Sequence, residues 1–271
     1  MKWLEITAHF TDEIKEPLLV HLLDLGIQGV IEEESAYRFY LNEDTDPQTI
    51  FTGQFGEVPF SAEVVDDANW AENWKQFWHA NKIGKFVVVP SWESYEKQGA
   101  EIVLNLDPGM AFGTGAHETT ALVLEFLGEV PVVPETVYDI GCGSGILAIA
   151  AAKLGAEVYA FDTDPLAVDA TLKNAEKNHV EGLIKVFGGN LLEDESLFPD
   201  KVPDLVLTNI IAEVIVEFVP LLKEKLGTFT WIVSGIISER LPMVLGALEE
   251  HGFTVTKRKD RGEWVALEAK I

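Results

Sequence analysis

The sequence contains a single cysteine, Cys142, among its 271 residues. One cysteine cannot form an internal disulfide or a cysteine-based metal cluster, so both are excluded, and a reducing compartment is indicated. No apolar run reaches the roughly 18 residues that a membrane-spanning helix requires, and the first residues lack the basic and then apolar pattern of a secretory signal. We therefore expect a cytoplasmic protein with no membrane partner and no bound metal.

Basic residues are also scarce. Twenty lysines and arginines stand against 45 acidic residues, which gives a formal net charge of −25. Such a field repels phosphate backbones and attracts cationic partners, which argues against nucleic acid as a direct partner. The charge by itself fits either a solvated acidic surface or a surface that receives a basic protein.

The length and the 47% content of apolar residues allow two domains. Residues 1–65 have the order β-α-β-β-α-β, which is the ferredoxin-like pattern of a small α+β domain. The pattern predicts strands over 3–10, 29–34, 37–41 and 60–65, and helices over 12–25 and 47–54.

A linker helix is predicted over residues 66–82. Trp70, Trp74 and Trp78 recur every fourth residue in it and would share one helical face. Such a stripe is more typical of a packing seam between domains than of a ligand cage.

Residues 83–271 alternate between strand and helix patterns, which predicts an α/β domain with a mostly parallel, Rossmann-like sheet. Asp164 and Pro165 are the expected start of one helix, because aspartate caps a helix and proline suits its first turn. The last two strands, joined through residues 260–263, are expected to form a hairpin that adds an antiparallel edge.

A glycine-rich turn follows the predicted strand at Val137, with the sequence DIGCGSG over residues 139–145. Gly141, Gly143 and Gly145 would bring backbone close to a ligand at a helix N-terminus. Asp162 ends the next strand at about the spacing from which an acid reaches a ribose. The third glycine stands one position earlier than a dinucleotide fingerprint requires, which favours adenosylmethionine over NAD. The alternative is a tight turn without a ligand, in which Cys142 is a small filler.

A second glycine-rich segment, DPGMAFGTGAHETT, covers residues 107–120. Such a loop can fold over a cofactor and offer hydroxyl and backbone N–H groups, and Phe112 and Gly113 at its centre are candidate contacts. We interpret His117 as the cap of the following helix rather than as a catalytic residue.

Two asparagines follow predicted strands, at the sheet edge where open α/β sheets bind ligands. The side-chain carbonyl of Asn209 could accept a hydrogen bond from an amine and aim its lone pair at a methyl group, or the residue could cap the next helix. Asn190 lies where an adenine edge would be read, or it forms a turn.

Together these motifs resemble the PrmA family, methyltransferases that act on the eleventh protein of the large ribosomal subunit. The resemblance rests on residues 107–120, 141–145, 161–165 and 208–212 and extends over the whole chain. It implies cofactor contacts at Thr120, Gly141, Asp162 and Asn209, and a small N-terminal domain that holds the substrate protein. Other amino methyltransferases usually place prolines and an aromatic residue after the asparagine, whereas Ile210 and Ile211 follow it here. This departure leaves open how tightly Asn209 orients the amine.

The resemblance implies an enzyme that transfers methyl groups from S-adenosyl-L-methionine to lysine side chains, an N-terminal α-amine, or both, on that ribosomal protein. We expect this enzyme to be a monomer. Three alternatives remain open: methylation of another protein or of a small molecule, a nucleoside-binding module without catalysis, and a dehydrogenase.

Overall fold

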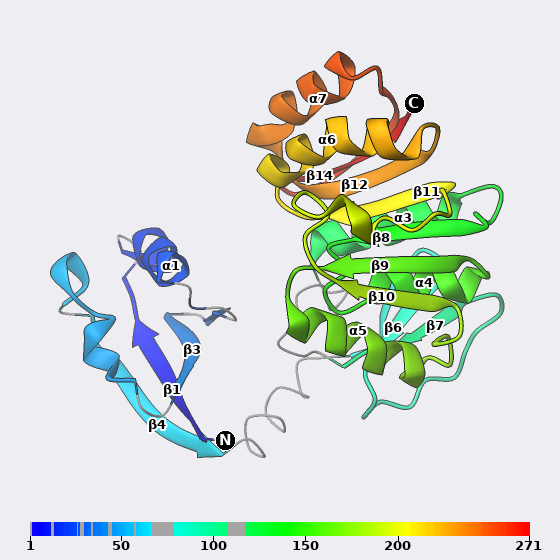
Figure 1. Ribbon diagram of the computed structural model, residues 1–271. Helices are drawn as coiled ribbons and strands as arrows, with labels where there is room; N and C mark the ends of the chain where they lie inside the picture. The colour runs from blue at the N-terminus through cyan, green and yellow to red at the C-terminus, as the bar shows by residue number, and fades with distance from the viewer. Residues whose placement is uncertain are drawn as a thin grey trace. The chain divides into compact units, whose positions relative to one another are not determined.

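The computed structural model describes residues 2–11, 14–25, 27, 30–33, 35–42, 45–56, 58–66, 79–107 and 117–271 (Figure 1). The chain divides into two compact units, residues 1–78 and residues 79–271. Each unit has its own apolar core, and each is described by itself. No helix among the described residues is long and apolar enough to span a membrane.

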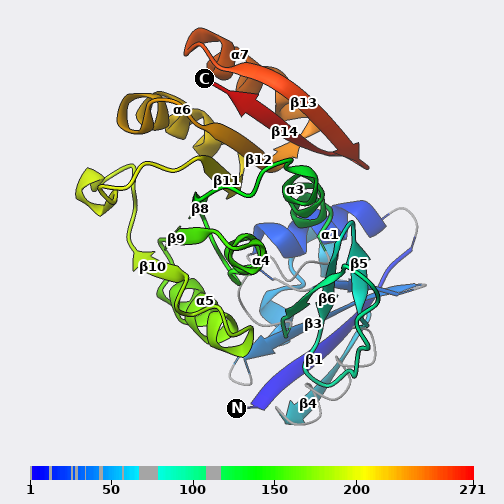
Figure 2. The ribbon, with the colours of Figure 1, turned by 90° about the vertical axis from the view of Figure 1, so that its right-hand side faces the viewer.

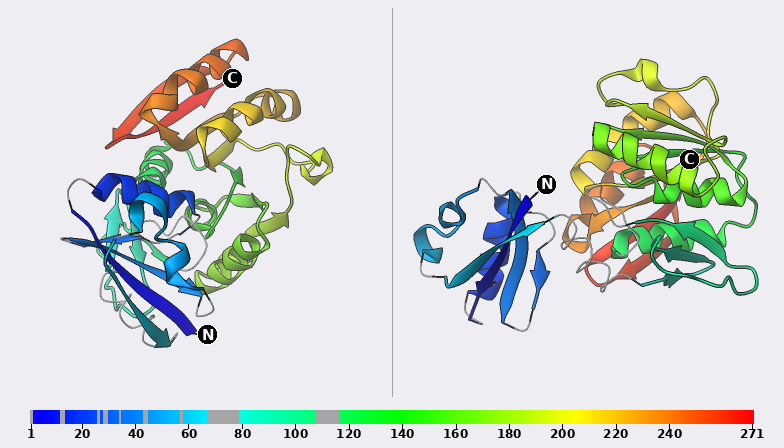
Figure 3. Two further views of the ribbon diagram at one scale, coloured as in Figure 1. Left: turned by 90° about the vertical axis from the view of Figure 1, so that its left-hand side faces the viewer. Right: turned by 90° about the horizontal axis from the view of Figure 1, so that it is seen from below.

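The N-terminal unit is an antiparallel sheet of four strands in the order β2-β3-β1-β4 (Figure 3). Leu18 and Leu22 of the helix α1 pack with Ile6 and Phe39 of the sheet. This strand order confirms the predicted ferredoxin-like pattern. The elements are β1 (Lys2–His9), α1 (Lys15–Asp24), β2 (Ile31–Glu32), β3 (Ala36–Asn42) and β4 (Phe60–Asp66).

The predicted second helix of this unit, residues 47–54, is wrong. Two short 3-10 turns, Pro47–Thr49 and Gly53–Phe55, take its place. Gly53 has a φ of +59°, a left-handed conformation that interrupts an α-helix, and β-branched residues between the turns have a low helix propensity.

The predicted linker helix falls mainly on residues 67–78, which lie outside the described residues, as do its three tryptophans. At its ends the structure differs from the prediction, because Asp66 is the last residue of β4 and Asn81 is the first residue of β5.

The C-terminal unit contains a seven-stranded sheet in the order β10-β9-β8-β11-β12-β14-β13. The five strands from β10 to β12 are parallel, and the β13–β14 hairpin adds two antiparallel strands at the edge, as predicted. The strands are β8 (Thr136–Ile140), β9 (Glu157–Asp162), β10 (Ile184–Gly188), β11 (Leu205–Asn209), β12 (Thr230–Ile237), β13 (Thr254–Arg261) and β14 (Trp264–Lys270).

Helices cover both faces of this sheet (Figure 2). The apolar cluster on one face includes residues of α3, α4 and α5, and the cluster on the other face includes residues of α6 and α7. Asp164 caps α5 through the Leu166 N–H at 2.9 Å, and Pro165 opens the helix, as predicted. The helices are α3 (Glu118–Glu129), α4 (Ile146–Leu154), α5 (Pro165–Lys177), α6 (Ala212–Leu226) and α7 (Leu241–Glu250), with 3-10 turns at Glu195–Leu197 and Ser238–Arg240.

A separate three-stranded sheet packs beside α3 and α4. The strand and helix alternation predicted from residue 83 onward did not indicate that β6 and β7 form a sheet of their own with β5. Local patterns indicate that a segment is extended, and the choice of neighbouring strand depends on tertiary packing. The strands are β5 (Asn81–Ile83), β6 (Phe86–Val89) and β7 (Ile102–Asn105).

Candidate active site

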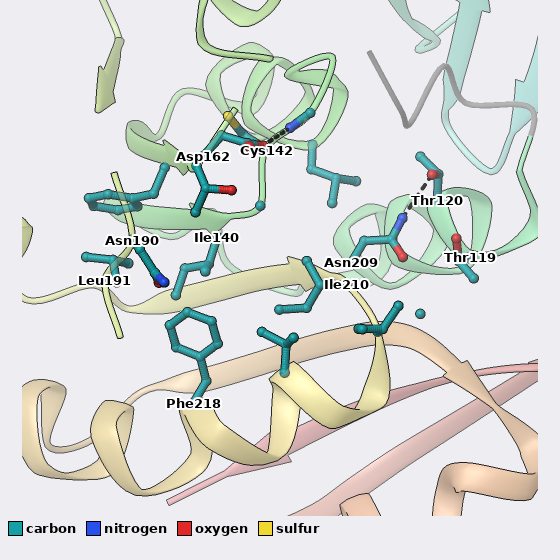
Figure 4. A pocket seen from close by; sticks show the side chains of 18 of the residues that line it. Thr119, Thr120, Ile140, Cys142, Asp162, Asn190, Leu191, Asn209, Ile210 and Phe218 are labelled. Atoms are coloured by element: carbon teal, nitrogen blue, oxygen red, sulfur yellow. Dashed lines mark hydrogen bonds between the residues drawn. The ribbon is translucent and has the colours of Figure 1, made fainter. Parts of the chain in front are cut away.

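A cavity of about 800 Å³ opens at the carboxyl ends of β8, β9, β10 and β11. Strands β8 and β11 are neighbours in the sheet, but the chain leaves β8 toward β9 on one side and β11 toward β12 on the other. Such a reversal of strand order creates the crevice in which open α/β sheets bind ligands. Gly141, Asp162 and Asn209, each at or next to the end of a different strand, line this cavity (Figure 4).

The glycine turn after β8 approaches its neighbours closely. Gly141 has a φ of +77°, and a Cβ atom there would lie 2.5 Å from the Cγ2 atom of Ile210, so only glycine fits. Gly141 and Gly143 line the cavity, and their contact with the cofactor stays a prediction. Gly145 does not line it. Its α-carbon faces Thr171 of α5, so we assign Gly145 to helix packing at the start of α4.

Asp162, the last residue of β9, is bound to the glycine turn. Its Oδ2 atom accepts the Gly143 N–H at 2.8 Å, and its Oδ1 atom accepts the Asp164 N–H at 3.0 Å. A carboxylate oxygen has two lone pairs, so each oxygen keeps capacity for one further donor. These two backbone bonds orient a half-buried carboxylate that can receive two adjacent hydroxyl groups.

Two titratable groups lie buried beside the turn. The Oδ2 atom of Asp139 accepts the Ala148 N–H at 2.9 Å, and no described residue pairs with its Oδ1 atom. Burial raises the pKa of Asp139 to about 7. Burial also raises the pKa of Cys142 well above its usual range, and Thr171 donates a hydrogen bond to its sulfur at 3.3 Å. Cys142 is therefore a packing residue, as predicted, because a nucleophile requires an accessible thiolate.

Asn209, at the end of β11, is bound to α3. Its Nδ2 atom donates to Oγ1 of the fully buried Thr120 at 3.1 Å. The cap residue of α6 is Ile211, and no side chain caps that helix, so the helix-cap alternative for Asn209 is wrong. Because its nitrogen is committed to Thr120, the side chain keeps its oxygen as an acceptor for an amine.

His117 caps α3, as predicted, since its Nδ1 atom accepts the Thr119 N–H at 3.3 Å. Its ring meets Trp264 edge-on, with centroids 5.0 Å apart, and both rings line the cavity. Burial lowers the pKa of His117. Burial therefore favours the uncharged form of this ring.

Asn190 also lines the cavity, but its side chain closes a turn. Its Oδ1 atom accepts the Leu192 N–H at 3.1 Å, and its Nδ2 atom donates to Glu193 at 3.0 Å. This is the turn alternative of the sequence analysis, and contact between Asn190 and an adenine stays a prediction. Phe112 and Gly113 lie outside the described residues, and their cofactor contacts also stay predictions.

The cavity suits a nucleoside, because it combines a carboxylate with apolar walls. Asp162 offers paired acceptors for ribose hydroxyls, and Leu191 and Phe218 supply apolar surface for a flat base. The described residues include no group of three or more histidine, cysteine, aspartate or glutamate side chains that could hold a metal ion. Adenosylmethionine, which requires no metal, fits these residues.

Comparison with known proteins decides the family. The profile described as ribosomal protein L11 methyltransferase (PrmA) matches residues 38–271. This chain belongs to the PrmA family. A relative named ribosomal protein L11 methyltransferase from Pelotomaculum thermopropionicum is 44% identical, with coverage of 100% of this chain and 99% of its own. Another of the same name, from Thermoanaerobacter pseudethanolicus, is 38% identical over 98% of each chain.

A solved structure supports the same family assignment. The crystal structure of a ribosomal protein L11 methylase from Lactobacillus delbrueckii subsp. bulgaricus is similar with a TM-score of 0.65 and 36% identity. The match covers 71% of this chain and 98% of that one. Membership of PrmA confirms the predicted family, the Rossmann-like fold and the assignment as an adenosylmethionine-dependent methyltransferase.

Several cavity residues of this PrmA chain were not predicted. They are mostly apolar or lie far along the sequence from the motifs: Ile140, Phe161, Leu191, Ile210, Phe218, Gly235 and Trp264. The helical spacing of Val214 and Phe218 places them on one face of α6, and sequence alone could have identified that face. Nothing in the sequence indicates that this face lines a ligand cavity instead of packing into the apolar core.

Proposed function

We propose that the chain methylates amino groups of ribosomal protein L11 in the cytoplasm, with lysine side chains, the N-terminal α-amine or both as acceptors. One observation carries the proposal: the Asn209 amide, fixed by Thr120, lines the same cavity as the glycine turn and Asp162. The relatives named ribosomal protein L11 methyltransferase support L11 as the substrate protein.

Adenosylmethionine supplies an activated methyl group on a sulfonium sulfur, so the protein mainly has to align the acceptor. Asp162 holds the ribose, and Gly141 and Gly143 let the backbone approach the cofactor closely. Asn209 Oδ1 accepts an N–H of the amine and thereby directs the nitrogen lone pair toward the methyl group.

The amine must lose its proton before it attacks. At pH 7 this costs about 4.6 kcal/mol for a lysine, with a reference pKa near 10.4, but only about 1 to 1.4 kcal/mol for an α-amine. Apolar walls lower the pKa of an amine because they disfavour its charged form. Ile210, which follows Asn209 in the chain, and Trp264 provide apolar walls in the same cavity. A carboxylate beside the nitrogen would oppose this effect, so we expect no acid in contact with the transferred methyl group.

The N-terminal unit supplies the docking surface in this proposal. Residues 1–65 carry 13 acidic residues against Lys2, Lys15 and Arg38. A strongly negative surface steers a basic protein toward the enzyme.

The test is methyl transfer from labelled adenosylmethionine to purified L11. The expected result is label on L11, located by peptide mass spectrometry on lysines or on the N-terminus. L11 with chemically acetylated amines is the matched control and should take up none. Label that goes to other proteins or to small molecules would redirect the substrate assignment, and an absence of transfer with retained cofactor binding would favour a non-catalytic module.

A further inference from the structure

Ile210, the residue after Asn209, is enclosed between two glycines of other loops. Its Cγ2 atom occupies the space that a side chain at Gly141 would need, since a Cβ there would lie 2.5 Å away. Its backbone occupies the space beside Gly235, where a Cβ would lie 2.0 Å from the Ile210 carbonyl oxygen and 2.7 Å from its carbonyl carbon. All three residues line the cavity.

Gly235 lies in an irregular part of β12. The pairing of β12 with β14 shifts register between Val233 and Ile236, and Gly235 has a φ of +89°. Just before it, the carbonyl of Ser234 accepts the Ile210 N–H at 3.2 Å. The bulge therefore holds the backbone of Ile210 both by a hydrogen bond and by close contact.

The sequence left open how tightly Asn209 is oriented when an isoleucine follows it. The contacts of Ile210 answer this question, because they fix the peptide next to Asn209 on two sides, through its side chain and through its backbone. The Thr120 hydroxyl fixes the side-chain amide of Asn209 from a third element, α3.

We propose that Ile210, held between Gly141 and Gly235, is the positioning residue that sets the Asn209 amide relative to the cofactor turn. This proposal rests on the proposed function. In this arrangement position 235 requires glycine, because a side chain there would prevent the Ile210 carbonyl from approaching β12. The contact between Ile210 and Gly141 ties the Asn209 peptide directly to the turn that approaches the cofactor.

Gly235→Ala is the first test. The added methyl group meets backbone, which cannot rotate away, so the Ile210 peptide must move. A displacement of about 1 Å at an aligning group can lower turnover about 100-fold, and we expect a loss of that size in kcat. The calorimetric Kd for adenosylmethionine should rise by a much smaller factor than kcat falls, because the Asp162 carboxylate is unchanged.

Gly155→Ala is the matched control. Gly155 also has a positive φ, +109°, but nothing lies within 4 Å of its would-be Cβ. Both variants carry the backbone strain of alanine at positive φ, and only Gly235→Ala pushes on Ile210. Similar melting temperatures with a kcat loss confined to Gly235→Ala support positioning, and equal kcat losses overturn it.

A readout independent of activity comes from NMR. The side-chain amide signals of Asn209 are those missing from the spectrum of Asn209→Asp. They should shift in Gly235→Ala and stay in place in Gly155→Ala. Unmoved signals in a folded Gly235→Ala protein would overturn the proposal.

Substitutions of Ile210 itself provide a second test in case Gly235→Ala does not fold. Ile210→Ala removes the contact with Gly141 and should lower kcat about tenfold, with a smaller change in the Kd for adenosylmethionine. Ile210→Val keeps the Cγ2 branch and should recover most of that loss. Equal activity of the alanine variant and wild type overturns the proposal. A wild-type protein that binds adenosylmethionine but does not methylate L11 would instead refute the proposed function, and the NMR comparison would still test the positioning of Asn209.

Discussion

The side-chain nitrogen of Asn209 donates a hydrogen bond to the hydroxyl oxygen of Thr120 at 3.1 Å and so joins the end of β11 to the first turn of α3. The two residues are 89 positions apart in the chain. The bond uses the side-chain nitrogen of Asn209 and leaves its oxygen available as a hydrogen-bond acceptor.

Asn209→Ala should lower kcat about 100-fold, because an unaligned amine seldom reaches the methyl group in a reactive orientation. The melting temperature should fall only by the loss of the Thr120 hydrogen bond, which is worth about 1 kcal/mol, since Asn209 caps no helix. Thr120→Val keeps the shape of the side chain but removes its hydroxyl, so it should give a smaller kcat loss in the same direction. Steady-state kinetics with L11 and a melting curve measure both effects. A large drop in stability with normal activity of the folded fraction would contradict the aligning role.

Asp162→Ala should weaken adenosylmethionine binding by about 1.5 to 3 kcal/mol, the usual worth of hydrogen bonds to a charged group. Asp164→Ala is the matched control, because its carboxylate caps α5 and does not line the cavity. The control should lose about 1 kcal/mol of stability and keep its affinity. Calorimetry gives the Kd values. Equal affinities of Asp162→Ala and wild type would remove the ribose assignment.

Asp139 makes stability depend on pH. Burial raises its pKa to about 7 in the folded protein, against about 3.9 in an unfolded chain. Between these values the folded state binds the proton and the unfolded state does not, so this group makes the free energy of unfolding fall as pH rises from about 4 to 7. Asp139→Asn keeps an acceptor for the Ala148 N–H and carries no charge, so the fall should be smaller in the variant. Denaturant unfolding at several pH values measures the free energy of unfolding of both proteins. Parallel plots of this free energy against pH would contradict the prediction.

The N-terminal unit should serve substrate docking and not cofactor binding. A chain that begins at His79 retains both apolar clusters of the C-terminal unit, so it should bind adenosylmethionine and lose efficient methylation of intact L11. For the full chain, KM for L11 should rise with salt as charge attraction is screened. Solubility is checked first. A soluble truncated protein that methylates L11 at the full-length rate would assign the acidic surface to solubility alone.

Sequence predicted those parts of the site that depend on local order along the chain. Asp162 and Asn209 could be assigned because each ends a strand, and the ends of parallel strands meet at one edge of a sheet. Gly145 shows the limit of a motif, because spacing does not indicate which α-carbon faces the ligand and which faces α5. Trp264 and Gly235 enter the cavity through strand pairing across the sheet, and the irregularity of β12 at Gly235 has no local signal.

The fold shows the same distinction between features that local sequence determines and features that tertiary packing determines. The alternation of strands and helices predicted the parallel sheet and its antiparallel hairpin. The partition of β5, β6 and β7 into a separate sheet was not predictable, since it depends on which neighbour each strand meets. The helix expected over residues 47–54 failed because Gly53 adopts a left-handed conformation in the folded unit.

A crystal structure of the protein with adenosylhomocysteine and an L11 peptide bearing the acceptor amine tests the central claim most directly. The account predicts both ribose hydroxyls on the Asp162 carboxylate, and the acceptor nitrogen on the Asn209 oxygen beside the cofactor sulfur. A ribose held by other residues, or an acceptor amine that approaches the sulfur without contact to Asn209, would contradict it.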